Sequence, residues 1–286
     1  MSFSSKISAR SRRRYAYDLL FRIVIFTLCA VAVLPLFFIF GFIFSKGASA
    51  LDLEFLTSLP KSIGESGGGV ANAITGSLLL VGLASLLAIP LGVAAGTYLS
   101  EYRGSKIAMI LGQAVEVLHG VPSIVIGLVV YALVVQPMGG FSAFSGSVAL
   151  GIMMIPVIAR STEETLRMLP KSLKEASLAL GATYASTLIR VVLPAGLSGI
   201  ITGVLLSLAR VAGETAPLLF TAFGNPFINW NLHKPVSSLP ALIFNYAVSP
   251  YDDWHRLAWG SACVLLIGVL GLNLFSRWLS RRWRWY

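Results

Sequence analysis

The chain has 286 residues, of which 56% are hydrophobic and only 12% are charged, and its mean hydropathy is +0.80. A soluble core of this size does not need so much apolar material, so the composition excludes an ordinary soluble domain and favours an integral membrane protein. The formal charge of +10 would suggest a nucleic-acid partner in a soluble protein, but here the charges flank apolar segments, where they orient a chain in the membrane.

Six apolar segments predict an all-α, polytopic integral membrane protein with six transmembrane helices. The segments cover residues 21–44, 74–99, 107–135, 147–168, 196–222 and 257–277. Each is near or above the ~20 residues that cross ~30 Å of hydrocarbon as a helix. The third segment is long, and Gly120 and Pro122 predict that it kinks or breaks into two pieces.

The basic residues predict how these spans are oriented. With the N-terminus inside, seventeen Lys and Arg residues, Arg160 among them, fall on the cytoplasmic side and four fall outside, while Arg210 lies within a span. Cytoplasmic loops carry such an excess. We therefore expect both termini in the cytoplasm, with residues 1–20 as a basic N-terminal segment, 21–277 as the membrane domain and 278–286 as a basic, aromatic tail at anionic headgroups. Residues 223–256 form an outer segment that either contacts an external partner or only connects the last two spans.

A pair of polar residues lies in the third predicted span, because Glu116 and His119 are separated by three positions and share one helix face. His119 either carries a proton and assists an anion, or serves as an interhelical hydrogen bonder. The sequence contains no metal-ligand spacing, no P-loop, and no H-E-x-x-H or G-x-S-x-G motif. It therefore predicts no metal and no catalytic residue.

The segment between the fourth and fifth spans reads Glu175-Ala176-Ser177, then Gly181, and then Leu193-Pro194. This order resembles the loop by which bacterial ABC importer permeases dock their ATPase subunits. Ser177 stands where the family usually has alanine, and Val191 where it usually has isoleucine. The resemblance implies that a loop of about 161–194 docks an ATPase through five residues, namely Glu175, Ala176, Gly181, Leu193 and Pro194.

Local signals in this segment predict its structure. Residues 172–180 have the pattern of a short helix that Gly181 ends, and residues 183–192 can form a second helix before Pro194 sets a turn into the fifth span. Ser172 and Glu175 also have the spacing of a capping box, so Glu175 is either a helix cap or a docking contact.

Two charged residues, Arg210 and Glu214, lie within the fifth predicted span. A charge at the bilayer centre costs roughly 2.5 to 3.5 kcal/mol on insertion scales, so such residues face a bundle interior or a wet cavity. At i and i+4 the two share a face and can pair, and Ser207 and Thr221 extend the polar stripe along this helix, while Gly213 and Pro217 weaken the helix nearby. The pair either fixes helix packing, or it lines a path in which the Arg210 guanidinium binds an oxyanion such as phosphate with two hydrogen bonds.

The stretches 209–219 and 116–127 resemble the permeases of phosphate-specific ABC importers, most of all the PstA-type subunit. The resemblance implies the type I ABC importer permease fold, in the bacterial inner membrane. It also implies four kinds of partner: a second homologous permease, two copies of an ATPase that uses ATP and Mg²⁺, a periplasmic phosphate-binding protein, and phosphate itself. This chain would bind no cofactor and would not be an enzyme. The path residues expected are Arg210, Glu214, Ser207, Glu116 and His119.

Two other classes of protein remain as alternatives. A proton-coupled secondary anion transporter or channel would use Glu116, His119 and Glu214 as a proton relay, but it leaves the docking-like loop without a purpose. An intramembrane enzyme would need a nucleophile–base or metal pair, for which the sequence shows no motif.

Overall fold

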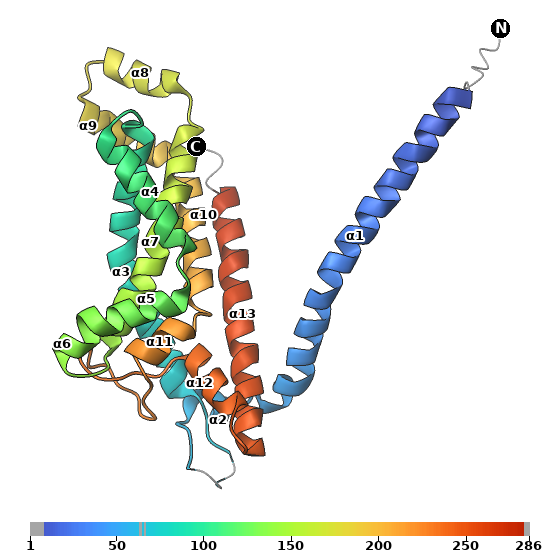
Figure 1. Cartoon of the computed structure of the whole chain (residues 1–286), viewed down its shortest axis with the longest axis vertical. Helices are drawn as coiled ribbons and strands as arrows, with labels where there is room; N and C mark the ends of the chain where they lie inside the picture. The colour runs from blue at the N-terminus through green and yellow to red at the C-terminus, as the bar shows by residue number, and fades with distance from the viewer. Residues whose placement is uncertain (1–8, 63–64, 66, 283–286) are drawn as a thin grey trace.

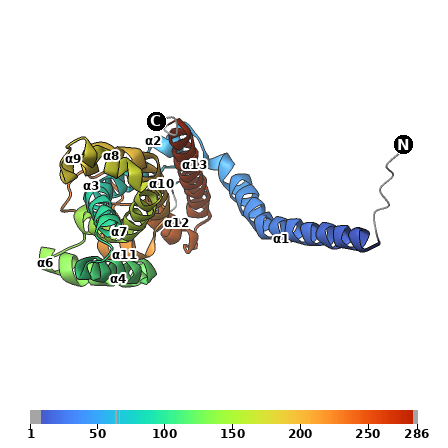
Figure 2. The same cartoon turned by 90° about the horizontal axis from the view of Figure 1, so that it is seen from above.

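The computed structural model describes residues 9–62, 65 and 67–282, and every element in that part of the chain is helical (Figure 1). This confirms the all-α prediction. The ends of the two predicted terminal segments, residues 1–8 and 283–286, lie outside the described residues. Most helices form one elongated bundle, whereas the first helix leaves the bundle (Figures 1 and 2).

The described residues contain five helical segments that are long and apolar enough to cross a membrane, and one bent helix pair that makes a sixth span. The six-span prediction is confirmed in this form. The five are α1 (Ala9–Gly47), α3 (Ala71–Glu101), α7 (Ala143–Arg167), the helix that ends with α10 (Leu193–Val211), and α13 (Asp252–Arg282).

The centre of the bundle is the pair α3 and α7. Gly92 and Gly96 have the small-xxx-small spacing that lets two membrane helices approach closely. A Cβ atom at Gly92 would lie 2.7 Å from Ile158 Cβ, so no larger residue fits there. Leu80, Leu150 and Met154 are fully buried, and they belong with Ile158 to the largest core cluster of the described residues.

The third predicted span is broken, as expected, into α4 (Lys106–Gly120) and α5 (Ser123–Val130). The axes turn by 105° between them. The residue before a proline is disfavoured in the helical conformation, and Val121 is accordingly extended with φ −68° and ψ 130°. A π-helical turn η2 (Tyr131–Val135) and α6 (Gln136–Met138) complete this span.

The fifth span differs from the prediction at both ends. No turn occurs at Pro194: α9 (Tyr184–Thr187), a π-helical turn η3 (Leu188–Val192) and α10 form one helix of 28 residues. The π turn makes room for the proline, whose ring would otherwise meet the carbonyl of the preceding turn. At the other end α10 stops at Val211, and a separate short helix α11 (Ala216–Thr221) follows.

The remaining elements are short and connect the spans. They are η1 (Ala48–Ala50), α2 (Leu53–Thr57), α8 (Lys171–Ala179) and α12 (Leu239–Ala247). The helix α1 contacts the bundle only near its C-terminal end. There the rings of Phe42 and of Trp259 in α13 pack edge to face, with their centroids 5.3 Å apart. The apolar side chains of α1 are otherwise exposed.

Candidate functional site

The break in the fifth span decides where Arg210 and Glu214 lie. Arg210 is in the last turn of α10, where a cation interacts favourably with the helix dipole, whereas Glu214 lies in the irregular segment before α11. Arg210 is exposed, Glu214 is partly buried, and no ion pair joins them among the described residues. The expectation of one helical face that carries both side chains is therefore wrong.

Gly213 and Pro217 explain why the helix breaks. Glycine is a poor helix former, and Pro217 has no N–H with which to continue the ladder of hydrogen bonds. The sequence predicted that these residues weaken the helix, but not that the break would separate the two charges. Ser207 and Thr221 are fully buried and donate to the Val204 and Pro217 carbonyls, so they form no stripe with Arg210.

The two broken spans meet through the short helices that follow their breaks. Helix α5 packs against α11, and a Cβ atom on Gly127 would lie 2.7 Å from Pro217 Cα. Val121, at the bend of the third span, and Val211, at the end of α10, belong to one core cluster. Irregular backbone at membrane depth is tolerated only where protein or a wet cavity surrounds it, so two adjoining breaks mark this region as a candidate site.

Glu116 and His119 both lie on the exposed face of α4. Glu116 forms an ion pair with Arg160 of α7, which the charge count had assigned to the cytoplasmic side. Arg160 also donates to the buried Glu163 at 2.8 Å, and Glu163 pairs in turn with Arg167. Sequence reasoning missed this four-residue network, although the i, i+3 and i+4 spacing of Arg160, Glu163 and Arg167 was a readable signal.

The predicted docking segment folds as expected around Gly181. Its φ is +85°, and the N–H groups of Gly181 and Ala182 donate to the carbonyls of Leu178 and Ser177. These are the two bonds of a Schellman motif, which ends α8 with a left-handed residue. No atom lies within 4 Å of a Cβ built on Gly181, so this glycine is needed for its backbone conformation and not for space.

The capping-box interpretation of Glu175 is wrong. Helix α8 starts at Lys171 after Pro170, no side chain caps it, and Ser172 lies inside its first turn. Glu175 and Ala176 are exposed, and no hydrogen bond or ion pair of Glu175 occurs among the described residues. The apolar residues nearby are also uncovered, since Leu180 is 90% exposed.

Three side chains fasten α8 to the end of α3. Lys174 and the Tyr184 hydroxyl both bind the Glu101 carboxylate, and the Lys174 ammonium lies 2.9 Å from the Tyr184 oxygen. Burial lowers the pKa of Lys174, but hydrogen bonds with Glu101 and Tyr184 outweigh it and raise that pKa above its usual range. Lys174 is therefore charged at physiological pH, so its ion pair with Glu101 persists.

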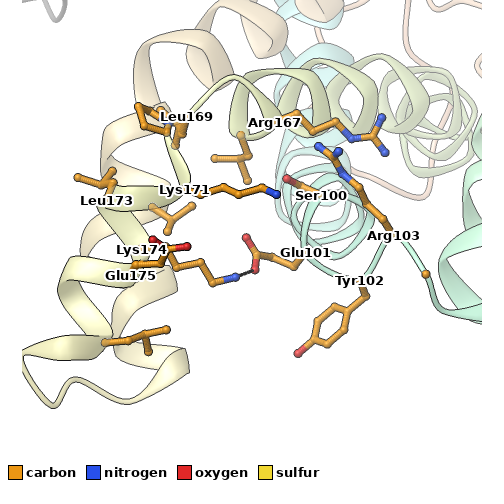
Figure 3. A pocket seen from close by; sticks show the side chains of 15 residues that line it. Ser100, Glu101, Tyr102, Arg103, Arg167, Leu169, Lys171, Leu173, Lys174 and Glu175 are labelled. Carbon is orange, nitrogen blue, oxygen red and sulfur yellow. Dashed lines mark hydrogen bonds and ion pairs between the residues drawn. The ribbon is translucent and has the colours of Figure 1, made fainter.

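A cavity of about 590 Å³ lies beside this anchor, between α8 and the ends of α3 and α7 (Figure 3). Its charged lining residues are four basic ones, namely Arg103, Arg167, Lys171 and Lys174, and two acidic ones, Glu101 and Glu175. The figure shows the guanidinium groups of Arg103 and Arg167 extending toward the same end of the cavity, with Lys171 reaching in beside them. The sequence placed these residues on one side of the membrane but could not bring them together.

These features define a multi-span membrane protein with an exposed helical loop at one end and two broken spans inside. The family of binding-protein-dependent transport system inner membrane components matches residues 88–285. One similar relative is the phosphate transport system permease protein PstA of Haemophilus influenzae, which is 44% identical over 82% of this chain and 83% of the relative. Another is the PstA protein of Yersinia pestis, which is 41% identical over 90% of this chain and 88% of the relative. The chain therefore belongs to this family of inner membrane components, among its PstA-type permeases.

Solved structures agree on the fold. An inward-facing structure of the MetNI methionine ABC transporter matches with a TM-score of 0.64 at 20% identity, covering 75% of this chain and 95% of that chain. A bacterial ABC transporter for the import of the polysaccharide alginate matches with a TM-score of 0.64 at 14% identity, covering 96% and 99%. The type I ABC importer permease fold is thereby confirmed.

Proposed function

We propose that this chain is the permease subunit that moves inorganic phosphate across the bacterial cytoplasmic membrane in an ATP-driven importer. The observation that carries the proposal is the pair of adjoining breaks, with His119 one residue before one break and Arg210 and Glu214 at the other. The PstA names of the relatives indicate phosphate as the substrate. No observation favours the proton-coupled alternative.

The chemistry of Arg210 suits this role. Guanidinium offers planar, paired donors that match an oxyanion, and it stays charged at every physiological pH. The side chain is exposed and forms no ion pair among the described residues, so it is available to a ligand. Glu214, nearby in the chain, can accept a hydrogen bond from a protonated phosphate. We propose Arg210 and Glu214 as the main path residues.

This proposal gives secondary roles to Glu116, His119 and Ser207. Glu116 is paired with Arg160, so its contact with an anion would run through that arginine. His119 can donate to phosphate when it is protonated. Ser207 is fully buried and bonded to its own helix, and it supports the turn that carries Arg210.

The loop that contains α8 would dock the ATPase through Glu175, Ala176 and Gly181. Leu193 and Pro194 would act by joining the loop to the fifth span. The charge bias supports both termini in the cytoplasm and places α8 there also. A second permease, two ATPase subunits with their ATP and Mg²⁺, and a periplasmic phosphate-binding protein would complete the importer.

Phosphate uptake into vesicles that hold the co-purified complex tests this function. Uptake should require ATP inside the vesicles and should be nearly abolished by Arg210→Ala at equal membrane insertion. Arg210→Lys keeps the charge but loses the bidentate fork, so it should be impaired and not silent. If the double variant Arg210→Ala/Glu214→Ala transports like the wild type, the two residues only support helix packing, and their proposed role in the phosphate path is wrong.

A further inference from the structure

We propose that the basic cavity beneath α8 is a binding site for an anionic phospholipid, with the headgroup phosphate among its cations and an acyl chain in a neighbouring apolar groove. The two cavities share Glu101 and Tyr102, so they adjoin. The proposal does not depend on which solute the protein transports.

The position of the cavity is that of a membrane boundary. The apolar run of α3 ends at Leu99, and Ser100-Glu101-Tyr102-Arg103 follows. Tyr98 and Tyr102 stack at 4.8 Å, and Tyr102 lies 6.5 Å from the Tyr184 ring. Tyrosines gather at the level of lipid headgroups, where one end of the side chain is apolar and the other is wet. This end of the bundle therefore lies at headgroup depth.

The charges of the cavity suit a phosphate diester. Lys174 pairs with Glu101, and Arg167 pairs with Glu163, but neither Arg103 nor Lys171 forms an ion pair among the described residues. Glu175 also lines the cavity, and the four cations outnumber it and Glu101, so the lining is net positive. Pro170 and Lys171 also bring the first turn of α8 into the cavity lining, and no side chain caps that helix. Phosphate groups bind at such sites through cations and backbone N–H groups together.

The neighbouring groove distinguishes a lipid from a free oxyanion. It has a volume of about 550 Å³ and lies between α3 and the long helix that starts at α9. Its lining is almost wholly apolar and includes Ile89, Val93, Ala94, Leu188 and Leu193. A soluble phosphate ion gains no binding energy from an apolar groove beside its site. A phospholipid, in contrast, can occupy the basic cavity with its headgroup and the apolar groove with an acyl chain.

A lipid bound in this cavity would contact α8 and the helix ends that the docking loop is proposed to move. The headgroup would bridge the start of α8 to the ends of α3 and α7, to which α8 is otherwise tied by the Glu101 anchor and by the chain at Pro170. Anionic lipid should therefore stabilise the position of α8 relative to the bundle.

The test uses the full chain in its assembled complex, in nanodiscs of phosphatidylcholine with a varied fraction of phosphatidylglycerol. Bound phosphatidylglycerol is counted by native mass spectrometry. Arg103→Gln and Lys171→Gln should each weaken its retention about fivefold, and the double variant about twenty-five-fold. Lys106→Gln/Arg190→Gln removes the same charge from exposed positions outside the cavity, so it should change retention less than twofold.

The apolar half is tested separately. Ala94→Trp fills the groove without a change of charge and should lower retention, whereas Leu86→Trp on the exposed face of the same helix should not. Equal losses in the cavity and control variants would show only a general surface attraction and overturn the site. Displacement of the lipid by millimolar inorganic phosphate would assign the cavity to a free oxyanion, and loss of the lipid on assembly would assign the groove to a partner helix; either result refutes the proposal.

Discussion

Replacement of Gly181 tests whether the shape of the docking loop couples this protein to its ATPase. The residue has φ +85°, a conformation that costs an L-residue with a side chain roughly 1–2 kcal/mol. Because no atom lies within 4 Å of the added Cβ, a substitution creates no clash, and the whole cost falls on the Schellman turn after α8. A cost of that size lowers the population of the native loop by a factor of about 5 to 30.

The measurement is ATP-dependent phosphate uptake together with ATPase co-purification, each divided by the amount of inserted permease. Asparagine tolerates the left-handed conformation better than other residues with a Cβ, and β-branched residues tolerate it worst. Activity should therefore fall in the order Gly181, Gly181→Asn, Gly181→Ala and Gly181→Val, while insertion stays near the wild-type level.

The matched control is Gly140→Val, which adds the same side chain into open space at a glycine whose φ is not in the left-handed region and which lies outside the cavity beneath α8. This variant should keep wild-type phosphate uptake and ATPase co-purification. Normal uptake and ATPase association in Gly181→Val would refute the argument, because the loop would then not need its left-handed turn. Equal defects in Gly181→Asn and Gly181→Val would also count against it, since backbone strain predicts a graded series.

Three further predictions concern packing, the anchor and topology. Gly127→Val should destabilise the chain by about 1–3 kcal/mol and lower its melting temperature, because the new Cβ would lie 2.7 Å from Pro217 Cα; an unchanged melting temperature would argue against the contact of α5 with α11. In a double-mutant cycle on ATPase association, Lys174→Met and Glu101→Gln should lose less together than the sum of the single losses, whereas strict additivity would mean that the two residues do not act as a pair. In a chain without native cysteines, a cysteine at Lys234 should react with an impermeant thiol reagent outside intact cells and one at Lys174 should not; labelling of Lys174 from outside would reverse the topology.

The sequence predicted the spans well because membrane crossing depends on length and apolar content, which are local properties. It also predicted the bend at Pro122 and the end of α8 at Gly181, since proline and glycine act through their own backbone. It failed at Pro194, where a π-helical turn in η3 keeps the helix continuous. A π turn has no sequence signature of its own, so the proline was expected to mark a boundary.

The charged residues were harder to place because their partners are distant in the sequence. Arg210 and Glu214 satisfy the spacing of a helical pair, but a helix break between them removes the pairing. Arg160 was counted with the cytoplasmic cations, yet it lies seven residues before the end of α7, about 10 Å along its axis, and binds Glu116 of α4. It thus lies within a helix that can cross the membrane, as Arg210 does. Only the packing of α4 on α7 shows this.

The continuity of the fifth span connects the two candidate regions. The 28-residue helix that begins at Tyr184 runs about 40 Å and ends beside Arg210. Its first residue binds the anchor of α8 through Glu101, and Ser177 of α8 lies 2.9 Å from the Thr187 hydroxyl one turn later. A turn at Pro194 would have placed a hinge between the docking loop and the break. Because the helix is instead continuous, a displacement of α8 in the proposed importer would act on one helix whose far end holds Arg210, so the loop and the path need no separate relay.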